Sequence, residues 1–117
     1  MFYTDISLTY TMGKIFMNGY SFEGPFKLDV HELPPDAGVC LVCTESGYGI
    51  KVMSIEDAEN VKEHIDGSKR RECWKRIAEK DVVDIYVLVM KNKDDRAKAA
   101  SVVRNARKYK LACEEEF

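Results

Sequence analysis

The chain has 117 residues, of which 45% are hydrophobic and 32% are charged, and this composition excludes a disordered chain and predicts one folded domain. Its formal net charge is only −2, but the charge is unevenly placed: residues 1–60 carry nine acidic and three basic side chains, whereas residues 61–113 carry fifteen basic and eight acidic ones. The longest clean apolar run, residues 85–90, is far too short to cross a bilayer, so we expect no contact with a membrane.

The first 34 residues predict a hairpin and a connector. Apolar and polar side chains alternate over residues 2–12, which is the pattern of a half-buried strand. Gly13-Lys14 predicts a turn, and residues 15–22 predict the returning strand, weakened by Asn18-Gly19 and ended by Gly24-Pro25. The segment that follows, up to Gly38, contains two adjacent prolines and is predicted to be a connector.

Residues 35–113 predict the core of the domain, and its first half reads as a hairpin followed by a helix. Residues 39–44 and 50–53 are short apolar strands on either side of a glycine-containing turn at 45–49. Ser54 is predicted to cap a helix, because Asp57 follows three residues later and an apolar stripe comes next. That stripe consists of Ala58, Val61 and Ile65, and Gly67 is predicted to stop the helix.

The second half of the core predicts a helix, a strand and a last helix. Residues 71–80 form the first of these helices, with Trp74 on its apolar side. Residues 82–90 are rich in β-branched side chains and predict a central strand. Asp94 or Asp95 is predicted to cap the last helix, whose inward stripe is Ala99, Val102, Val103 and Ala106. The sequence thus predicts a single α+β domain with a small antiparallel sheet flanked by helices, closed by an acidic tail at 114–117.

The four cysteines are predicted to be free thiols. Met1 leads directly into the alternating pattern and not into an apolar leader, which predicts a cytoplasmic protein. Cys40 and Cys43 have the spacing of a zinc knuckle, but three residues along a strand place two side chains on opposite faces. We therefore expect both to be buried in the core, and we expect no metal site and no cofactor.

Cys73 is the cysteine with the most reactive surroundings in the sequence. Nearby cations lower the pKa of a thiol, and five basic residues lie within four positions of Cys73. A cysteine-based enzyme would also need a base, for which His64 is the only plausible residue. The favoured interpretation is that Cys73 packs beside Trp74, and catalysis is the alternative.

A basic stretch between residues 69 and 76 is the main candidate for a binding site. Phosphate backbones attract clustered cations, and an exposed tryptophan can stack on an unpaired base. The competing interpretation is a solvated charged face with its tryptophan in the core. The candidate nucleic-acid-binding residues are Lys69, Arg70, Arg71, Trp74, Lys75 and Arg76.

The order of elements from Pro35 to Cys113 resembles the GIY-YIG nuclease domain. The resemblance is carried by Ala37-Gly38-Val39-Cys40-Leu41-Val42, Ile50-Lys51-Val52-Met53-Ser54, Asn60-Val61-Lys62-Glu63-His64-Ile65 and Arg71-Glu72-Cys73-Trp74, together with the strand at 82–90 and the closing segment 104–113. It implies four strands, two helices, a strand and a helix, with the N-terminal hairpin as an addition.

The departures from that family remove the residues that the resemblance would make catalytic. Cys40 stands where the first motif has a tyrosine, and Lys51 and Met53 stand where the second has a tyrosine and a glycine. His64 or Val61, depending on the alignment, stands where the family has its arginine. Residues 96–113 contain no glutamate to hold the metal on which the family's hydrolysis depends.

We therefore expect a catalytically inactive GIY-YIG-like domain that binds nucleic acid through its basic half. One alternative is a protein–protein adaptor or homo-oligomer that uses the N-terminal hairpin, whose Tyr3, Tyr10 and Tyr20 would form the contact surface. The second alternative is the enzyme built on Cys73.

Overall fold

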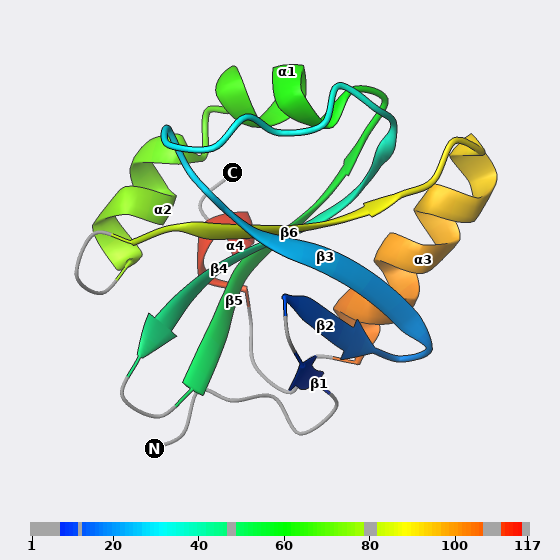
Figure 1. The fold of residues 1–117 in the computed structure, drawn as a ribbon, viewed down its shortest axis with the longest axis horizontal. Helices are drawn as coiled ribbons and strands as arrows, with labels where there is room; N and C mark the ends of the chain where they lie inside the picture. The colour runs from blue at the N-terminus through cyan, green and yellow to red at the C-terminus, as the bar shows by residue number, and fades with distance from the viewer. Residues whose placement is uncertain (1–7, 12, 47–48, 79–81, 107–110, 116–117) are drawn as a thin grey trace.

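The computed structural model describes residues 8–11, 13–46, 49–78, 82–106 and 111–115, and these form an α+β fold (Figure 1). Six antiparallel strands make one sheet in the order β1-β2-β3-β6-β4-β5. The strands are β1 (Leu8–Thr11), β2 (Lys14–Met17), β3 (Tyr20–Lys27), β4 (Gly38–Ser46), β5 (Gly49–Ala58) and β6 (Asp84–Val89). The helices are α1 (Val61–Asp66), α2 (Arg71–Ile77), α3 (Lys93–Asn105) and α4 (Ala112–Glu115).

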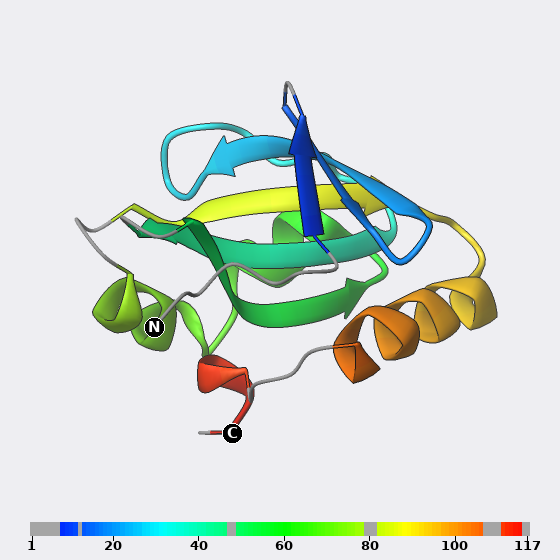
Figure 2. The same cartoon turned by 90° about the horizontal axis from the view of Figure 1, so that it is seen from below.

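The sheet is built around β6, the strand that the sequence predicted to be central. It lies between β3 and β4 and is hydrogen-bonded to both. Its side chains from Ile85 to Val87 are buried, because other parts of the chain pack against both faces of the sheet there: Tyr86 lies in one buried cluster, and Ile85 and Val87 lie in the other. Figure 1 shows α2 and α3 on opposite sides of the central strands, and Figure 2 shows α4 beneath β5. None of the described helices is long and apolar enough to cross a membrane.

The N-terminal region contains three strands where two were predicted. Asn18 and Gly19 both have positive φ, at 53° and 87°, so they form the tight turn between β2 and β3 and do not merely weaken a single strand. The prediction that Gly24-Pro25 ends the strand is also wrong, because β3 continues to Lys27 with a register shift against β6. Of the strand predicted at residues 2–12, the described part is Leu8–Thr11.

The helix predicted to begin at Ser54 is a strand as far as Ala58. β4 offers a pairing partner over this whole length, from Val42 opposite Ser54 to Gly38 opposite Ala58. Long-range pairing thus overrides the local cap and stripe signals. The helix α1 begins at Val61, where the Asn60 side chain accepts a hydrogen bond from Glu63 N at 3.1 Å, and it ends at Gly67 as predicted.

A register shift in the β4–β5 pair decides which β5 side chains face which helices. Val42 pairs with Ser54 and Cys43 pairs with Val52, so Met53 is an extra residue on β5. Beyond it, Ser54 contacts Trp74 of α2, whereas Asp57 contacts Arg96 of α3. Because side chains alternate along a strand, the shift sets which residues after Met53 face α2 and which face α3.

The core is divided by the sheet into two clusters of buried side chains. One lies toward α3 and includes Leu41 and Cys43, and the other lies toward α1 and α2 and includes Cys40 and Trp74. The prediction that Cys40 and Cys43 are buried on opposite faces is confirmed.

The last helix, α3, starts earlier than predicted and packs a partly different face. Its N-cap is Asn92, whose side chain accepts a hydrogen bond from Asp95 N at 3.0 Å. Ala99 and Val103 are buried as predicted, but Val102 is 37% exposed. Arg96 takes an inward position instead, where it donates hydrogen bonds to Asp57 and to the carbonyl oxygen of Lys91.

Candidate functional site

A hollow in the surface lies where α1 and α2 meet the edge strand β5. It has a volume of about 390 Å³ and opens to solvent. The loop between the two helices forms one wall, and β5 forms the floor. The residues that line it are Glu56, Glu63, His64, Gly67, Ser68, Lys69 and Arg70.

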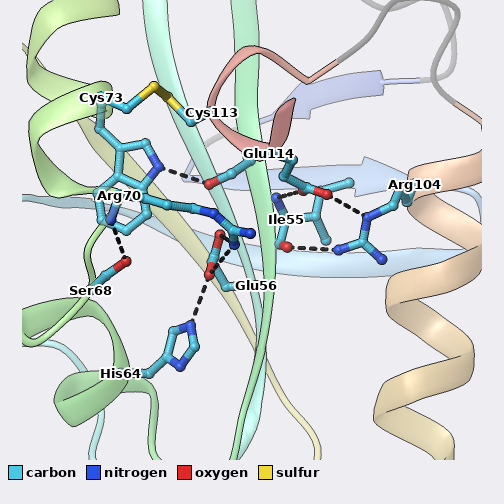
Figure 3. Close-up of polar contacts among 11 residues, drawn as sticks. Ile55, Glu56, His64, Ser68, Arg70, Cys73, Arg104, Cys113 and Glu114 are labelled. Carbon is cyan, nitrogen blue, oxygen red and sulfur yellow. Dashed lines mark hydrogen bonds and ion pairs between the residues drawn. A yellow bond between two sulfur atoms is a disulfide. The ribbon is translucent and has the colours of Figure 1, made fainter. Parts of the chain in front are cut away.

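The floor of this hollow is a buried carboxylate held by two basic side chains. Glu56 is only 3% exposed. His64 Nε2 lies 2.8 Å from Glu56 Oε1, and Arg70 Nη1 donates to Oε1 at 3.1 Å and to Oε2 at 2.9 Å (Figure 3). Glu56 on β5 therefore joins a residue of α1 to the residue that precedes α2.

The electrostatic balance at Glu56 favours its ionised form. Burial by itself would raise the pKa of this carboxyl group. The hydrogen bond from His64 and the positive charge of Arg70 outweigh burial, so the pKa of Glu56 lies below its ordinary value. The negative charge of Glu56 in turn partly neutralises the positive charge of Arg70.

The loop from Gly67 to Arg70 carries the polar groups at the mouth of the hollow. Gly67 ends α1, with its backbone nitrogen donating to the carbonyl oxygen of Glu63 at 3.0 Å. Ser68 Oγ accepts a hydrogen bond from Arg70 N at 3.1 Å, which fixes the turn into α2. Lys69 lies between them and is exposed. The loop thus presents a lysine and a hydroxyl group beside His64.

The structure separates the basic residues of the predicted binding stretch into two groups. Arg71 and Lys75 both form ion pairs with Asp29, and their hydrogen bonds lower the pKa of that carboxyl group. Arg70, Arg71 and Lys75 therefore form the first group, in which each side chain pairs with an acidic residue. Lys69 and Arg76 have exposed side chains, and Lys75 remains 54% exposed despite its ion pair.

Trp74 is the anchor of α2 in the core. It has no exposed surface, and its Nε1 donates a hydrogen bond to Ser54 Oγ at 2.9 Å. The core interpretation of Trp74 is confirmed. Its ring is therefore closed to a nucleic-acid base in this structure, and the candidate interface lacks an aromatic platform at this position.

Two of the four cysteines contradict the prediction of free thiols. Cys73 of α2 and Cys113 of α4 form a disulfide, with their Cα atoms 5.7 Å apart (Figure 3). The base and the thiol of the cysteine-based alternative therefore have separate partners: His64 contacts Glu56, and the Cys73 sulfur is bonded to Cys113. The other two are buried thiols, and burial raises the pKa of Cys40 far above its ordinary value, with smaller contributions from Glu56 and Asp57.

A second polar cluster holds the C-terminal segment on the edge of β5. Glu114 Oε2 accepts a hydrogen bond from Ile55 N at 2.7 Å, and Arg104 Nη2 donates to Ile55 O at 2.9 Å. Arg104 Nε also donates to Glu114 Oε1 at 2.8 Å, which closes the cluster (Figure 3). Glu114, expected in an acidic tail, thus belongs to α4 and accepts a hydrogen bond from one backbone amide of the edge strand, while Arg104 donates to the carbonyl oxygen of the same residue.

Sequence reasoning missed Glu56, which is the centre of the candidate site. The sequence predicted a helix that begins at Ser54, and it assigned no role to Glu56. The alternation of Ser54, Glu56 and Ala58 was the available signal, since these three residues share one face of a strand. The hydrogen bonds to Trp74, His64 and Arg70 depend on the tertiary fold and have no local signature.

The sequence matches no protein-family model, and the searches of curated proteins and of solved structures gave no significant match. Within the described ranges, no group of three or more histidine, cysteine or acidic residues is placed to hold a metal ion. The site is therefore interpreted from its own geometry.

Proposed function

We propose that this chain is a catalytically inactive GIY-YIG-like domain that binds single-stranded nucleic acid through the loop 67–70 and α2. The order of β4, β5, α1, α2, β6 and α3 supports this proposal, because the resemblance rests on the order of the elements between Pro35 and Cys113. The family's tyrosine, arginine and glutamate positions are occupied by other residues, so the proposal is binding without hydrolysis.

The observation that carries the proposal is the position of Lys69 at the open hollow. Within the described residues, no ion pair involves Lys69, and its exposed ammonium group lies on the same loop as Ser68 and Arg70. A phosphate oxygen accepts hydrogen bonds from such groups, and an ammonium group adds charge attraction. An unpaired strand can place a single phosphate in a hollow of this size, whereas a duplex presents its phosphates on a broad cylinder.

The proposed interface is smaller than the one read from the sequence. Lys69, Lys75 and Arg76 have exposed side chains, although Lys75 also pairs with Asp29. Arg70 and Arg71 are less exposed and pair with Glu56 and Asp29. Three phosphate contacts to a single strand correspond to a slope of about −2 for log affinity against log salt. We therefore expect moderate, salt-sensitive affinity.

Fluorescence anisotropy with labelled single strands and duplexes tests this function. We expect single strands to bind at about 50 mM salt and to lose about tenfold or more in affinity by about 200 mM. Lys69→Glu should weaken binding at least about fivefold. Its matched control is Lys93→Glu, which reverses an exposed lysine at the start of α3, away from the hollow.

Two results would overturn the proposal. One is the absence of binding at low salt. The other is equal weakening by the two lysine variants, since that would show a general charge effect with no role for the loop 67–70.

A protein-binding role for the N-terminal hairpin is the second candidate function. β1 lies at one end of the strand order, and Phe16 of the adjacent β2 is 43% exposed although it is a large apolar side chain. Tyr20 packs against the core, while Tyr3 and the side chain of Tyr10 lie outside the described part of the chain. A solution mass well above 13.4 kDa that Phe16→Ser restores to the monomer value would support this role.

A further inference from the structure

We infer that the hollow between β5, α1 and α2 recognises one ribonucleotide unit, so that the single strand bound is RNA and not DNA. This inference rests on the proposed function and names its substrate class. It comes from the two kinds of polar group in the hollow: hydrogen-bond donors and a cation on the loop 67–70, and a carboxylate on α1.

The cationic side of the hollow suits the phosphate of such a unit. Lys69 and Ser68 lie on one loop. The backbone nitrogen of Arg70 donates a hydrogen bond to the side-chain Oγ of Ser68, which holds that loop in place. The Glu56 carboxylate is already engaged by His64 and Arg70, so its charge is locally compensated. A phosphate can therefore approach Lys69 without facing an uncompensated buried charge.

Glu63 is the group that a phosphate alone does not explain. Its side chain is exposed, lines the same hollow, and makes no ion pair within the part of the chain that the structure describes. A carboxylate accepts hydrogen bonds and repels anions, so its natural partner is a donor on the ligand. The ribose 2′-hydroxyl is such a donor, it lies next to the phosphate, and DNA lacks it.

The size of the hollow agrees with one unit of a strand. Its volume of about 390 Å³ is near the lower end of the range for small-molecule sites. Lys75 and Arg76 are exposed on α2, which begins where the loop ends, and Lys75 pairs with Asp29 at a second hollow. We assign these two cations to neighbouring phosphates of the same strand. The ligand is therefore a strand with one unit seated in the hollow.

The test compares RNA and DNA strands of the same sequence on the wild-type chain and on three variants by anisotropy. The wild-type chain should prefer RNA by at least about tenfold, the lower end of what one hydrogen bond to a charged group contributes. Glu63→Ala removes the acceptor and should lower that ratio to near one, whereas Lys69→Gln should weaken both strands and keep the ratio. Glu59→Ala removes an exposed carboxylate just before α1 that does not line the hollow, and it should leave both affinities unchanged.

The outcomes separate this inference from the proposed function. Equal binding of RNA and DNA by the wild-type chain, or a ratio that survives Glu63→Ala, would overturn the inference and leave nucleic-acid binding intact. No binding of either strand would remove both. Adenosine 5′-monophosphate at about 1 mM should displace little RNA, because it lacks the α2 contacts, and full displacement would show that the ligand is a free nucleotide.

Discussion

Arg70 and Glu56 form a two-point contact in which one guanidinium nitrogen lies 2.9 Å and 3.1 Å from the two carboxylate oxygens. Glu56 is buried on β5, and Arg70 begins the turn into α2, so this contact connects the edge of the sheet to the proposed binding loop. The position of the loop 67–70 therefore depends on a residue that lies outside it.

Replacing the buried carboxylate should destabilise the fold. Glu56→Gln removes the charge that pairs with Arg70 and His64, and both partners are partly exposed, at 28% and 38% of their side chains. Solvent therefore relieves part of the penalty, and we expect a loss of about 2 kcal/mol in the free energy of unfolding. Urea unfolding measures it, with Glu59→Gln as a control that should change stability by less than about 0.5 kcal/mol. An unchanged midpoint for Glu56→Gln would contradict this role.

The same carboxylate should make stability depend on pH in the acidic range. The pKa of Glu56 is lower in the folded chain than in the unfolded one, so the unfolded chain binds its proton first as pH falls. The stabilising contribution is complete above the unfolded pKa of about 4.3 and is lost as pH falls through the folded pKa. The difference in unfolding free energy between the wild type and Glu56→Gln should thus shrink as pH falls below about pH 4. A difference that grows as pH falls below about pH 4 would contradict this sign.

The hydrogen bond between Ser54 and Trp74 should be needed for the packing of α2. Ser54→Ala leaves the buried Trp74 Nε1 without its acceptor, which costs about 1–2 kcal/mol of stability. Trp74 is the single tryptophan of the chain, so its fluorescence reports unfolding directly. Ser101→Ala changes an exposed serine on α3 and should leave the unfolding midpoint unchanged. Equal midpoints for the two variants would contradict the account of Trp74 as an anchored core residue.

The Glu114 carboxylate should protect one backbone amide on the edge of β5. Glu114→Ala removes the acceptor of Ile55 N and the partner of Arg104. We expect amide hydrogen exchange at Ile55 to become about tenfold faster, with a smaller change at Leu41, its partner on β4. Exchange at Ile55 that is as slow as in the wild type would show that another group covers this edge.

The disulfide should be detectable in the purified chain without any structure determination. Under denaturing conditions and without reductant, alkylation should modify two cysteines, Cys40 and Cys43, and reduction should make all four reactive. The bond closes a loop with a sequence separation of 40 residues, for which chain entropy predicts a stabilisation of about 4 kcal/mol. Four reactive cysteines before reduction would show that the bond does not form.

The fold was predictable from the sequence where local and tertiary signals agree. The β-branched segment at 82–90 contains the central strand, and Gly67 ends α1 as its position suggested. The prediction failed at Ser54, where a possible cap and a three-to-four spacing of apolar residues imitate a helix while β4 supplies the pairing that decides the structure. It also failed at Asn18-Gly19, a strong hairpin signal that was read as a weak point.

The candidate site was less predictable than the fold, for a physical reason. The basic stretch could be identified from the sequence. The acidic partners of Arg70 and Arg71, however, lie 14 and 42 residues away in the sequence, so no local pattern predicts these ion pairs. The pairing of Cys73 with Cys113 likewise depends on the packing of α2 against α4. Long-range contacts therefore reduced the predicted interface to the residues that remain exposed.

The central claim is tested most directly by titrating the isotope-labelled chain with a short single-stranded RNA and following its backbone amide resonances. The account predicts that the largest chemical-shift changes fall on residues 63–70 and along α2, and that Lys69→Glu reduces them. Changes confined to β1 and β2, with the loop 67–70 unaffected, would contradict it and favour the N-terminal hairpin as the binding surface.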